Sequence, residues 1–187
     1  MVEGYPGAVY RGFETLEEAD AFLRIKEPQD TEAPSVLFGS SEQQLDEMPS
    51  HYAFVDGSFC VSTGVYGFGG FLIGPGEKHV LQGKGDDPEM ASMRNVAGEI
   101  LGSRAAIAKA IELGWKELVI YYDYLGIEMW ANGSWKRNKK GTIAYFDYIQ
   151  SVKNRISLIF CKVKGHSGVQ GNEEADRLAK EAVGISE

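Results

Sequence analysis

The order of strand and helix patterns over residues 51–187 constrains the fold of this chain more than any other feature. Three strand patterns follow one another closely, over 51–59, 66–73 and 79–85, which is typical of an antiparallel meander. Helix and strand patterns then alternate, with helices at 89–113, 126–131, 143–152 and 172–182 and strands at 118–123 and 156–163. We therefore predict an α/β fold with a mixed five-stranded sheet, its three antiparallel strands first, flanked by helices.

The first 50 residues do not share this pattern. Residues 1–26 contain one turn, one short strand pattern and one helix pattern, which is too little to bury a core. Residues 27–50 are acidic and polar and contain three of the six prolines, as linkers do. We predict three parts: an N-terminal segment at 1–26, an acidic linker at 27–50 and a main domain at 51–187.

The charge distribution leaves nucleic acid open as a partner although the chain carries a net charge of −8. Residues 1–50 hold 3 basic and 11 acidic side chains, whereas residues 51–187 hold 16 of each sign. The main domain can therefore keep local basic patches. The chain shows neither an apolar stretch long enough for a bilayer nor a signal peptide, and its two cysteines suit a reduced compartment. We expect a cytoplasmic monomer without an obligate protein partner.

Four carboxylates from two strands and two helices are candidate metal ligands: Asp56, Glu99, Asp123 and Asp176. An acid at the end of a strand or helix is usually a cap or a solvated side chain, and each of the four taken alone has this alternative interpretation. Asp56 and Asp123, however, follow consecutive apolar strand residues, and a lone buried carboxylate is costly unless it is paired or bound to a metal. An all-oxygen ligand set favours Mg²⁺ or Mn²⁺ over Zn²⁺. Two such ions could assist hydrolysis of a phosphodiester.

A glycine-rich loop after the last strand pattern supplies a candidate proton-transfer group. Gly165, Gly168 and Gly171 free the backbone there, and His166 lies between them. Asn172 is placed to cap the helix that follows, with Asp176 expected in its first turn. A satisfied loop histidine and an ordinary capped helix are the alternative interpretation, and these residues alone do not decide between the two.

Four sequence words in this order resemble type 1 ribonuclease H across residues 52–183. They are Phe-Val-Asp-Gly-Ser around Asp56, Arg-Asn-Val-Ala-Gly-Glu ending at Glu99, Ile-Tyr-Tyr-Asp ending at Asp123, and the segment from Val163 to Asp176. The resemblance implies a ribonuclease H fold and an endonuclease that cuts the RNA strand of RNA–DNA hybrids. It also implies 5′-phosphate and 3′-hydroxyl products and two Mg²⁺ ions per site, with Mn²⁺ as the alternative ion.

The resemblance also implies roles for single residues. Asp56 would bridge the two ions and Asp176 would help to hold the ion that activates water. Glu99 and Asp123 would hold the ion that faces the leaving oxygen, and His166 would assist proton transfer or product release. Residues matching substrate contacts of the family are Gly57, Ser58, Asn95, Trp135, Lys136 and Asn172. Among these, Asn95 would read the RNA 2′-hydroxyl, which distinguishes RNA from DNA.

Residues 4–23 resemble the second half of the hybrid-binding domain at the head of many type 1 ribonucleases H. Tyr10 and Arg11 match positions of that domain that contact nucleic acid. The sequence words of its first half are not found here, so we expect a remnant that binds hybrids weakly. The inserted basic helix of some family members also looks reduced, to Lys136 and the basic residues around it.

Two other functions fit the same fold. One is a non-catalytic module that binds RNA–DNA hybrids, because a fold does not fix a function. A module of this kind would tolerate replacement of Asp56 by asparagine. The other is a transposase-like or exonuclease relative, which would cut duplex DNA equally well.

Overall fold

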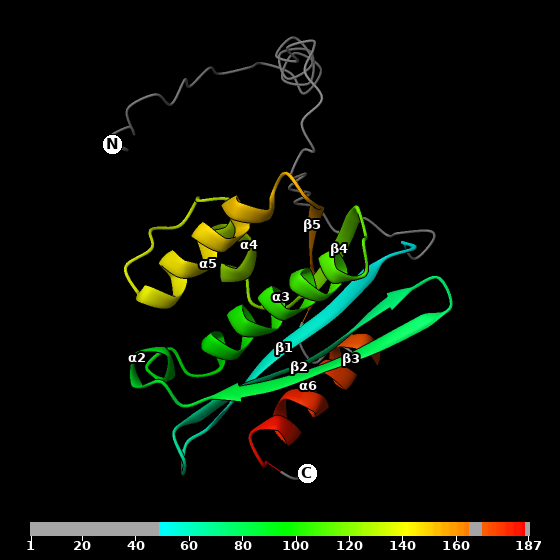
Figure 1. Cartoon of the computed structure of the whole chain (residues 1–187). Helices are drawn as coiled ribbons and strands as arrows, with labels where there is room; N and C mark the ends of the chain where they lie inside the picture. Colours follow the sequence, from blue (N-terminus) through cyan, green and yellow to red (C-terminus); the bar gives the residue numbers. More distant parts are fainter. Residues whose placement is uncertain (1–48, 165–169, 186–187) are drawn as a thin grey trace, which may run out of the picture. The chain divides into compact units, whose positions relative to one another are not determined.

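In the part of the chain that the structure describes, five strands form one sheet in the order β3-β2-β1-β4-β5 (Figure 1). The computed structural model describes residues 49–164 and 170–185. The first three strands pair antiparallel, and β4 and β5 run parallel to β1. Their bounds are β1 (Tyr52–Cys60), β2 (Val65–Gly74), β3 (Glu77–Gly85), β4 (Glu117–Tyr122) and β5 (Ser157–Lys162). The mixed sheet with its antiparallel strands first confirms the prediction.

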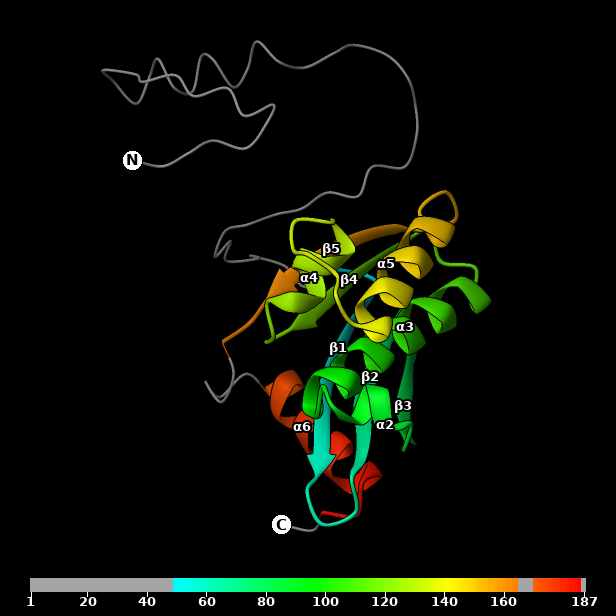
Figure 2. The same ribbon diagram turned by 90° about the vertical axis from the view of Figure 1, so that its left-hand side faces the viewer.

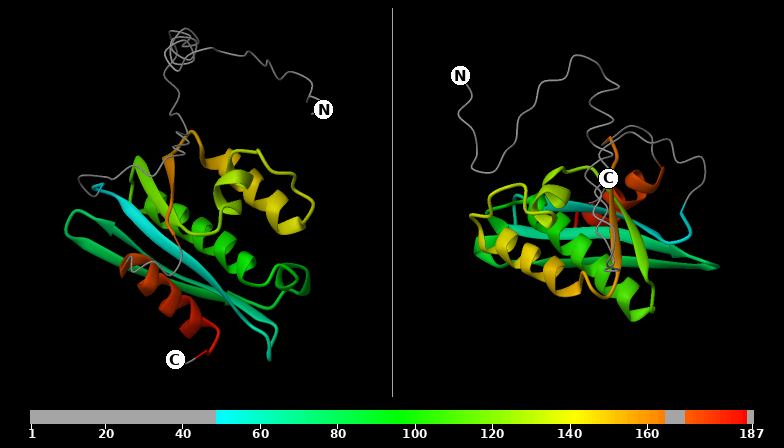
Figure 3. Two further views of the ribbon diagram at one scale, coloured as in Figure 1. Left: turned by 180° about the vertical axis from the view of Figure 1, so that it is seen from behind. Right: turned by 90° about the horizontal axis from the view of Figure 1, so that it is seen from above.

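Among residues 49–164 and 170–185, five helices lie on the two sides of this sheet (Figures 2 and 3). They are α2 (Pro88–Ala91), α3 (Asn95–Glu112), α4 (Gly126–Ala131), α5 (Lys140–Val152) and α6 (Gln170–Ala182). α6 packs on the hairpin strands on one face, and α3 packs on the other face with α4 and α5 beyond it. In the described ranges, no helix has the length and apolarity that crossing a membrane requires.

Two apolar clusters correspond to these two faces. The larger lies under α3, α4 and α5 and includes Ile107, Ile120 and Tyr145, each fully buried. The smaller lies on the α6 face and contains Phe54, Phe71 and Leu178 among other buried residues. Because alternate strand residues point to opposite faces, Phe54 and its neighbour Val55 enter different clusters. Burial on both faces explains the near-continuous apolar run of β4.

Three helix boundaries differ from the prediction, and one is that of α5, which begins at Lys140 rather than at residue 143. The helix expected at 89–113 is divided, because Arg94 adopts φ 53° and ψ −132°, outside the helical region. The short α2 has its own N-cap, the Asp87 side chain, which accepts a hydrogen bond from the backbone N–H of Met90 at 2.9 Å. α6 already contains Gln170, so Asn172 lies within the helix rather than at its cap, and Asp176 lies in the second turn rather than the first.

Candidate metal centre and active site

The parallel pairing of β1 and β4 places two of the candidate carboxylates side by side. Phe54 pairs with Tyr121, and two residues later in each segment come Asp56, on β1, and Asp123, directly after β4. Asp56 is only 8% exposed, and its Oδ1 accepts a hydrogen bond from the backbone N–H of Gly57 at 2.7 Å. Asp123 is half-buried, directly after the last residue of β4.

The third carboxylate, that of Glu99, comes close to the other two because α3 crosses β1 and β2 at a short distance. A Cβ on Gly98 would lie 1.9 Å from the carbonyl oxygen of Gly67, and a Cβ on Gly57 would lie 2.5 Å from the backbone nitrogen of Glu99. Only glycine allows backbones to approach this closely. The Glu99 side chain is consequently buried beside the strands, with 1% exposed surface.

Carboxylate oxygens of Asp56, Glu99 and Asp123 lie within 4.8 Å of one another. Burial and the charge of Asp123 raise the pKa of Asp56 to about 7. Burial, followed by the charges of Asp56 and Asp123, raises the pKa of Glu99 well above its ordinary value. Buried acids that repel one another in this way need either protons or a cation.

The donor set fits a divalent cation that prefers oxygen ligands. The three side chains offer only carboxylate oxygens, which suit Mg²⁺, Mn²⁺ or Ca²⁺. Oε2 of Glu99 is buried without a hydrogen-bond partner among the described residues. An acceptor oxygen left without a donor is costly, and a cation at this point would satisfy it.

Asp176 lies near this group but is not part of the set of three. Its charge contributes to the raised pKa of Asp56, and its Oδ2 lies 2.7 Å from Nζ of Lys180 one turn along α6. Asn172, one turn before Asp176, is 4% exposed, and its Oδ1 has no hydrogen-bond partner among the described residues. His166 lies outside the described residues, so its predicted role stays a prediction.

The predicted substrate contacts differ in their exposure. Asn95 and Lys136 are exposed, Gly57 is half-buried and Ser58 is only 9% exposed. Asn95 is the first residue of α3, one turn before Glu99, so it lies on the same helix end as the carboxylate group. The exposed Asn95 side chain can therefore contact a ligand bound at the N-terminal end of α3. Ser58 offers little surface for such a contact.

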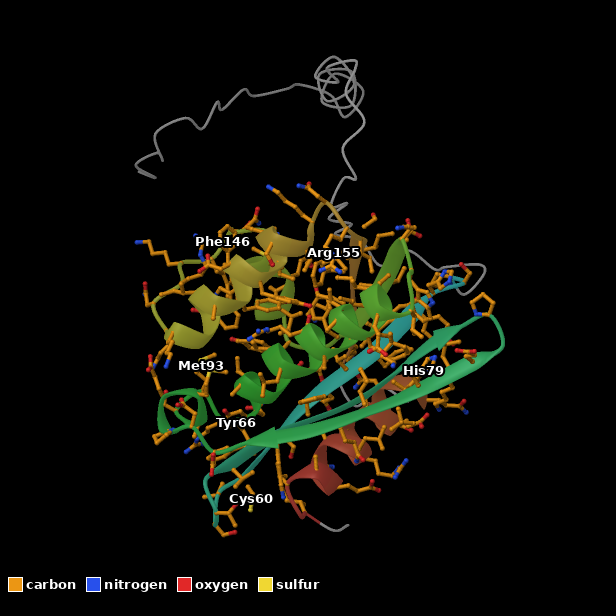
Figure 4. The ribbon with its side chains drawn as sticks, viewed as in Figure 1. Cys60, Tyr66, His79, Met93, Phe146 and Arg155 are labelled. Atoms are coloured by element: carbon orange, nitrogen blue, oxygen red, sulfur yellow. The ribbon has the colours of Figure 1, made fainter. Side chains whose placement is uncertain are left out.

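Two of the three tryptophans, Trp130 and Trp135, differ in exposure within an aromatic group after β4. Trp130 is buried in the larger apolar cluster, while Trp135 keeps 36% of its surface exposed. Their ring centroids lie 5.8 Å apart, and Tyr124, the residue after Asp123, lies 6.5 Å from Trp135. In the basic turn that follows, the Arg137 guanidinium lies 4.0 Å from the centroid of the Phe146 ring, which Figure 4 labels on α5.

Two partners of the site were not predicted from the sequence. Lys180 follows Asp176 by four residues, and this i,i+4 spacing on a helix was the available signal. Tyr122, which precedes Asp123, donates a hydrogen bond from its hydroxyl group to the Glu128 carboxylate. No sequence signal indicates this second pair, because its residues belong to different elements whose packing angle is set by the fold.

Comparison with known proteins identifies the family. The family model "RNase H" matches residues 49–184, and "Ribonuclease H1 N-terminal domain" matches residues 1–23. Ribonuclease H1 of Mus musculus is 26% identical over 242 residues, covering 100% of this chain and 83% of that protein. Ribonuclease H of Francisella philomiragia is 32% identical over 143 residues, covering 70% and 89%.

A solved structure shows the same fold. The crystal structure of LC11-RNase H1 in complex with RNA/DNA hybrid superposes with a TM-score of 0.56 at 17% identity, covering 71% of this chain and 99% of that one. The sheet order, the carboxylate group and the family model that spans the main domain lead to one conclusion. The chain belongs to the ribonuclease H family.

Proposed function

We propose that this chain is a divalent-metal-dependent endoribonuclease that hydrolyses the RNA strand of RNA–DNA hybrids to 5′-phosphate and 3′-hydroxyl ends. Family membership gives the domain ribonuclease H activity. The observation that carries the proposal is the group of three carboxylates, in which a buried oxygen of Glu99 has no hydrogen-bond partner among the described residues. A site used only to bind nucleic acid would gain nothing from three mutually repelling acids facing a polyanion.

The proposed metal is Mg²⁺, two ions per site, with Mn²⁺ as the alternative. Asp56, Glu99 and Asp123 would hold it, joined by Asp176. Bound there, such ions activate water and stabilise charge on the attacking and leaving oxygens. The chain's own contribution is to hold the carboxylates close together, although burial and their mutual repulsion favour protonation of Asp56 and Glu99 when no cation is bound. His166 would move the proton or help the product to leave.

The substrate side of the proposal rests on exposed residues around the carboxylates. Asn95 would read the 2′-hydroxyl, and Lys136 with its basic neighbours would contact phosphates of the DNA strand. Trp135 would pack against a sugar with its exposed edge. Gly57, Ser58 and Asn172 would support the same contacts. The LC11-RNase H1 structure, which contains an RNA/DNA hybrid on this fold, supports the choice of substrate.

The deciding experiment is cleavage of a hybrid that carries a label on its RNA strand. We expect internal cuts in the RNA with Mg²⁺, none with EDTA, and none with the Asp56→Asn variant. Labelled duplex DNA in parallel separates this activity from that of a transposase-like or exonuclease relative. Intact RNA under every condition, together with tight hybrid binding, would instead identify a binding module. A cytoplasmic, monomeric protein remains our expectation, which fractionation and sedimentation would test.

A further inference from the structure

Tyr122 and Glu128 form a buried polar pair, and Tyr122 immediately precedes the candidate metal ligand Asp123 in the sequence. Tyr122 is the last residue of β4, and Glu128 lies in α4. The tyrosine hydroxyl donates a hydrogen bond to Oε2 of Glu128. The two side chains keep 0% and 7% of their surface exposed. The pair therefore joins the end of a strand to the first turns of the next helix inside the protein.

Asp123 lies in the short connection that this pair closes. On one side, the carbonyl oxygen of Tyr122 accepts a hydrogen bond from the backbone N–H of Val163 at 2.8 Å, which fixes the strand end to the chain after β5. On the other side, the carbonyl oxygen of Tyr124 accepts from the N–H of Ile127 at 3.0 Å, which starts the helix. The Tyr122–Glu128 hydrogen bond links the strand end and the helix start that these two backbone hydrogen bonds fix. The backbone of Asp123 is thus held from both ends.

A buried glutamate at this place needs a reason other than stability. Burying a carboxylate is unfavourable, and an apolar pair of the same size commonly gives equal or greater stability. What a directional hydrogen bond adds is a defined geometry between the two elements. The ring of Phe160, edge-on to Tyr122 at a centroid distance of 6.2 Å, further restricts the tyrosine. The pair is well suited to fixing where the connection runs.

We propose that Tyr122 and Glu128 are positioning residues that hold the Asp123 carboxylate within reach of Asp56 and Glu99, and so set the affinity of the centre for its divalent cation. This inference rests on the proposed function only in taking the three carboxylates as the cation site. Neither residue belongs to the carboxylate group itself. Groups hydrogen-bonded to metal ligands change metal affinity about 10- to 100-fold when they are replaced, and a pair that acts only through the backbone of Asp123 should reach the lower end of that range.

The variants that test this are Tyr122→Phe, Glu128→Ala and Glu128→Gln. The first two remove the hydrogen bond, whereas glutamine keeps an acceptor oxygen for the tyrosine hydroxyl. Tyr121→Phe is the matched control, because it makes the same change one residue earlier, at a buried hydroxyl without a hydrogen-bond partner among the described residues. Tyr145→Phe is a second control, which removes a buried hydroxyl bonded to Ser103 at 2.9 Å in the same core.

Two quantities are measured. The first is the affinity for Mn²⁺ without nucleic acid, determined from the electron paramagnetic resonance signal of free Mn²⁺. The second is the Mg²⁺ concentration that gives half-maximal cleavage. Urea unfolding of each variant reports whether it folds. We expect Tyr122→Phe and Glu128→Ala to weaken Mn²⁺ binding about 10-fold, and to raise the half-activating Mg²⁺ concentration similarly. Glu128→Gln, Tyr121→Phe and Tyr145→Phe should stay within about 3-fold of the parent protein.

The two proposals fail in different ways. If the parent protein binds Mn²⁺ and cleaves hybrids while Tyr122→Phe binds the ion equally well, the positioning role is wrong and the proposed function stands. Equal weakening by Tyr122→Phe and Tyr145→Phe would reduce the pair to a general stability effect and would also overturn the role. If the parent protein binds Mn²⁺ but leaves hybrids uncut, the proposed function fails, and the binding comparison still decides the role of Tyr122. If Tyr122→Phe does not fold, the Mn²⁺ affinities of Glu128→Ala and Glu128→Gln are compared instead, because only the first of these two variants loses the acceptor oxygen.

Discussion

Replacing Asp56 by asparagine should stabilise the metal-free protein while abolishing its activity. Asp56 is buried between two other acids, and its pKa is raised to about 7 from an ordinary value of 3.8. The folded state therefore binds a proton that the unfolded chain releases, and stability falls as the pH rises between these two values. Asparagine carries no charge at any pH, so the variant escapes this loss.

The size of the effect follows from the pKa difference. At pH 8 a shift from 3.8 to about 7 corresponds to a destabilisation of about 4 kcal/mol, because each unit is worth about 1.4 kcal/mol. The asparagine amide is also buried, and unpaired amide hydrogens cost about 1–3 kcal/mol. We therefore expect Asp56→Asn to be more stable than the parent protein by about 1–3 kcal/mol at pH 8. The advantage should shrink towards pH 4, where the parent carboxyl is protonated.

Urea unfolding in EDTA at a series of pH values between 4 and 8 measures this difference. Asp147→Asn is the matched control, since it removes the same charge from an exposed position on α5 and should change stability by no more than about 0.5 kcal/mol. If Asp56→Asn were no more stable than the parent at pH 8, or if both lost stability equally with rising pH, the assignment of the repulsion to Asp56 would be refuted.

Three further perturbations test other parts of the structure. Gly98→Ala should cost more than about 2 kcal/mol in urea unfolding, since its Cβ would lie 1.9 Å from the Gly67 oxygen, whereas Gly102→Ala, with Phe68 Cβ at 3.2 Å, should cost far less. Lys78→Ala should cost under about 1 kcal/mol, less at high salt, because its 2.7 Å pair with Glu174 is partly exposed. Adding Mg²⁺ should raise the melting temperature of the parent protein but not of Asp56→Asn, as differential scanning calorimetry would show; equal shifts would place the ion elsewhere.

Much of the fold was predictable because its signals are local. The strands around Phe54 and Ile120 are marked by apolar, β-branched runs, and short turns between the first three strands dictate their antiparallel pairing. The break before α3 was not predictable. It depends on Arg94 adopting a positive φ, which residue preferences disfavour and only the surrounding packing imposes.

The candidate site likewise has residues that the sequence predicts and contacts that it does not. Asp56 and Asp123 were recognisable as acids that follow apolar strand residues, and Glu99 by its sequence word. That these three converge, while Asp176 stands slightly apart beside Lys180, depends on how closely α3 and α6 approach the sheet. The Tyr122–Glu128 bond likewise depends on tertiary packing, which periodicity and motifs do not report.

The short ladder between β1 and β4 has a consequence for how the chain is held together. The hairpin strands pair with the later half of the sheet over three residue pairs, from Tyr52 with Val119 to Phe54 with Tyr121. Asp56 and Asp123 lie just past the open end of this seam. An ion bound by both would act as a removable cross-link between segments far apart in sequence, and because its site exists only while the seam is closed, binding would stabilise the folded chain. Withdrawal of the ion would therefore loosen the seam as well as stop the reaction.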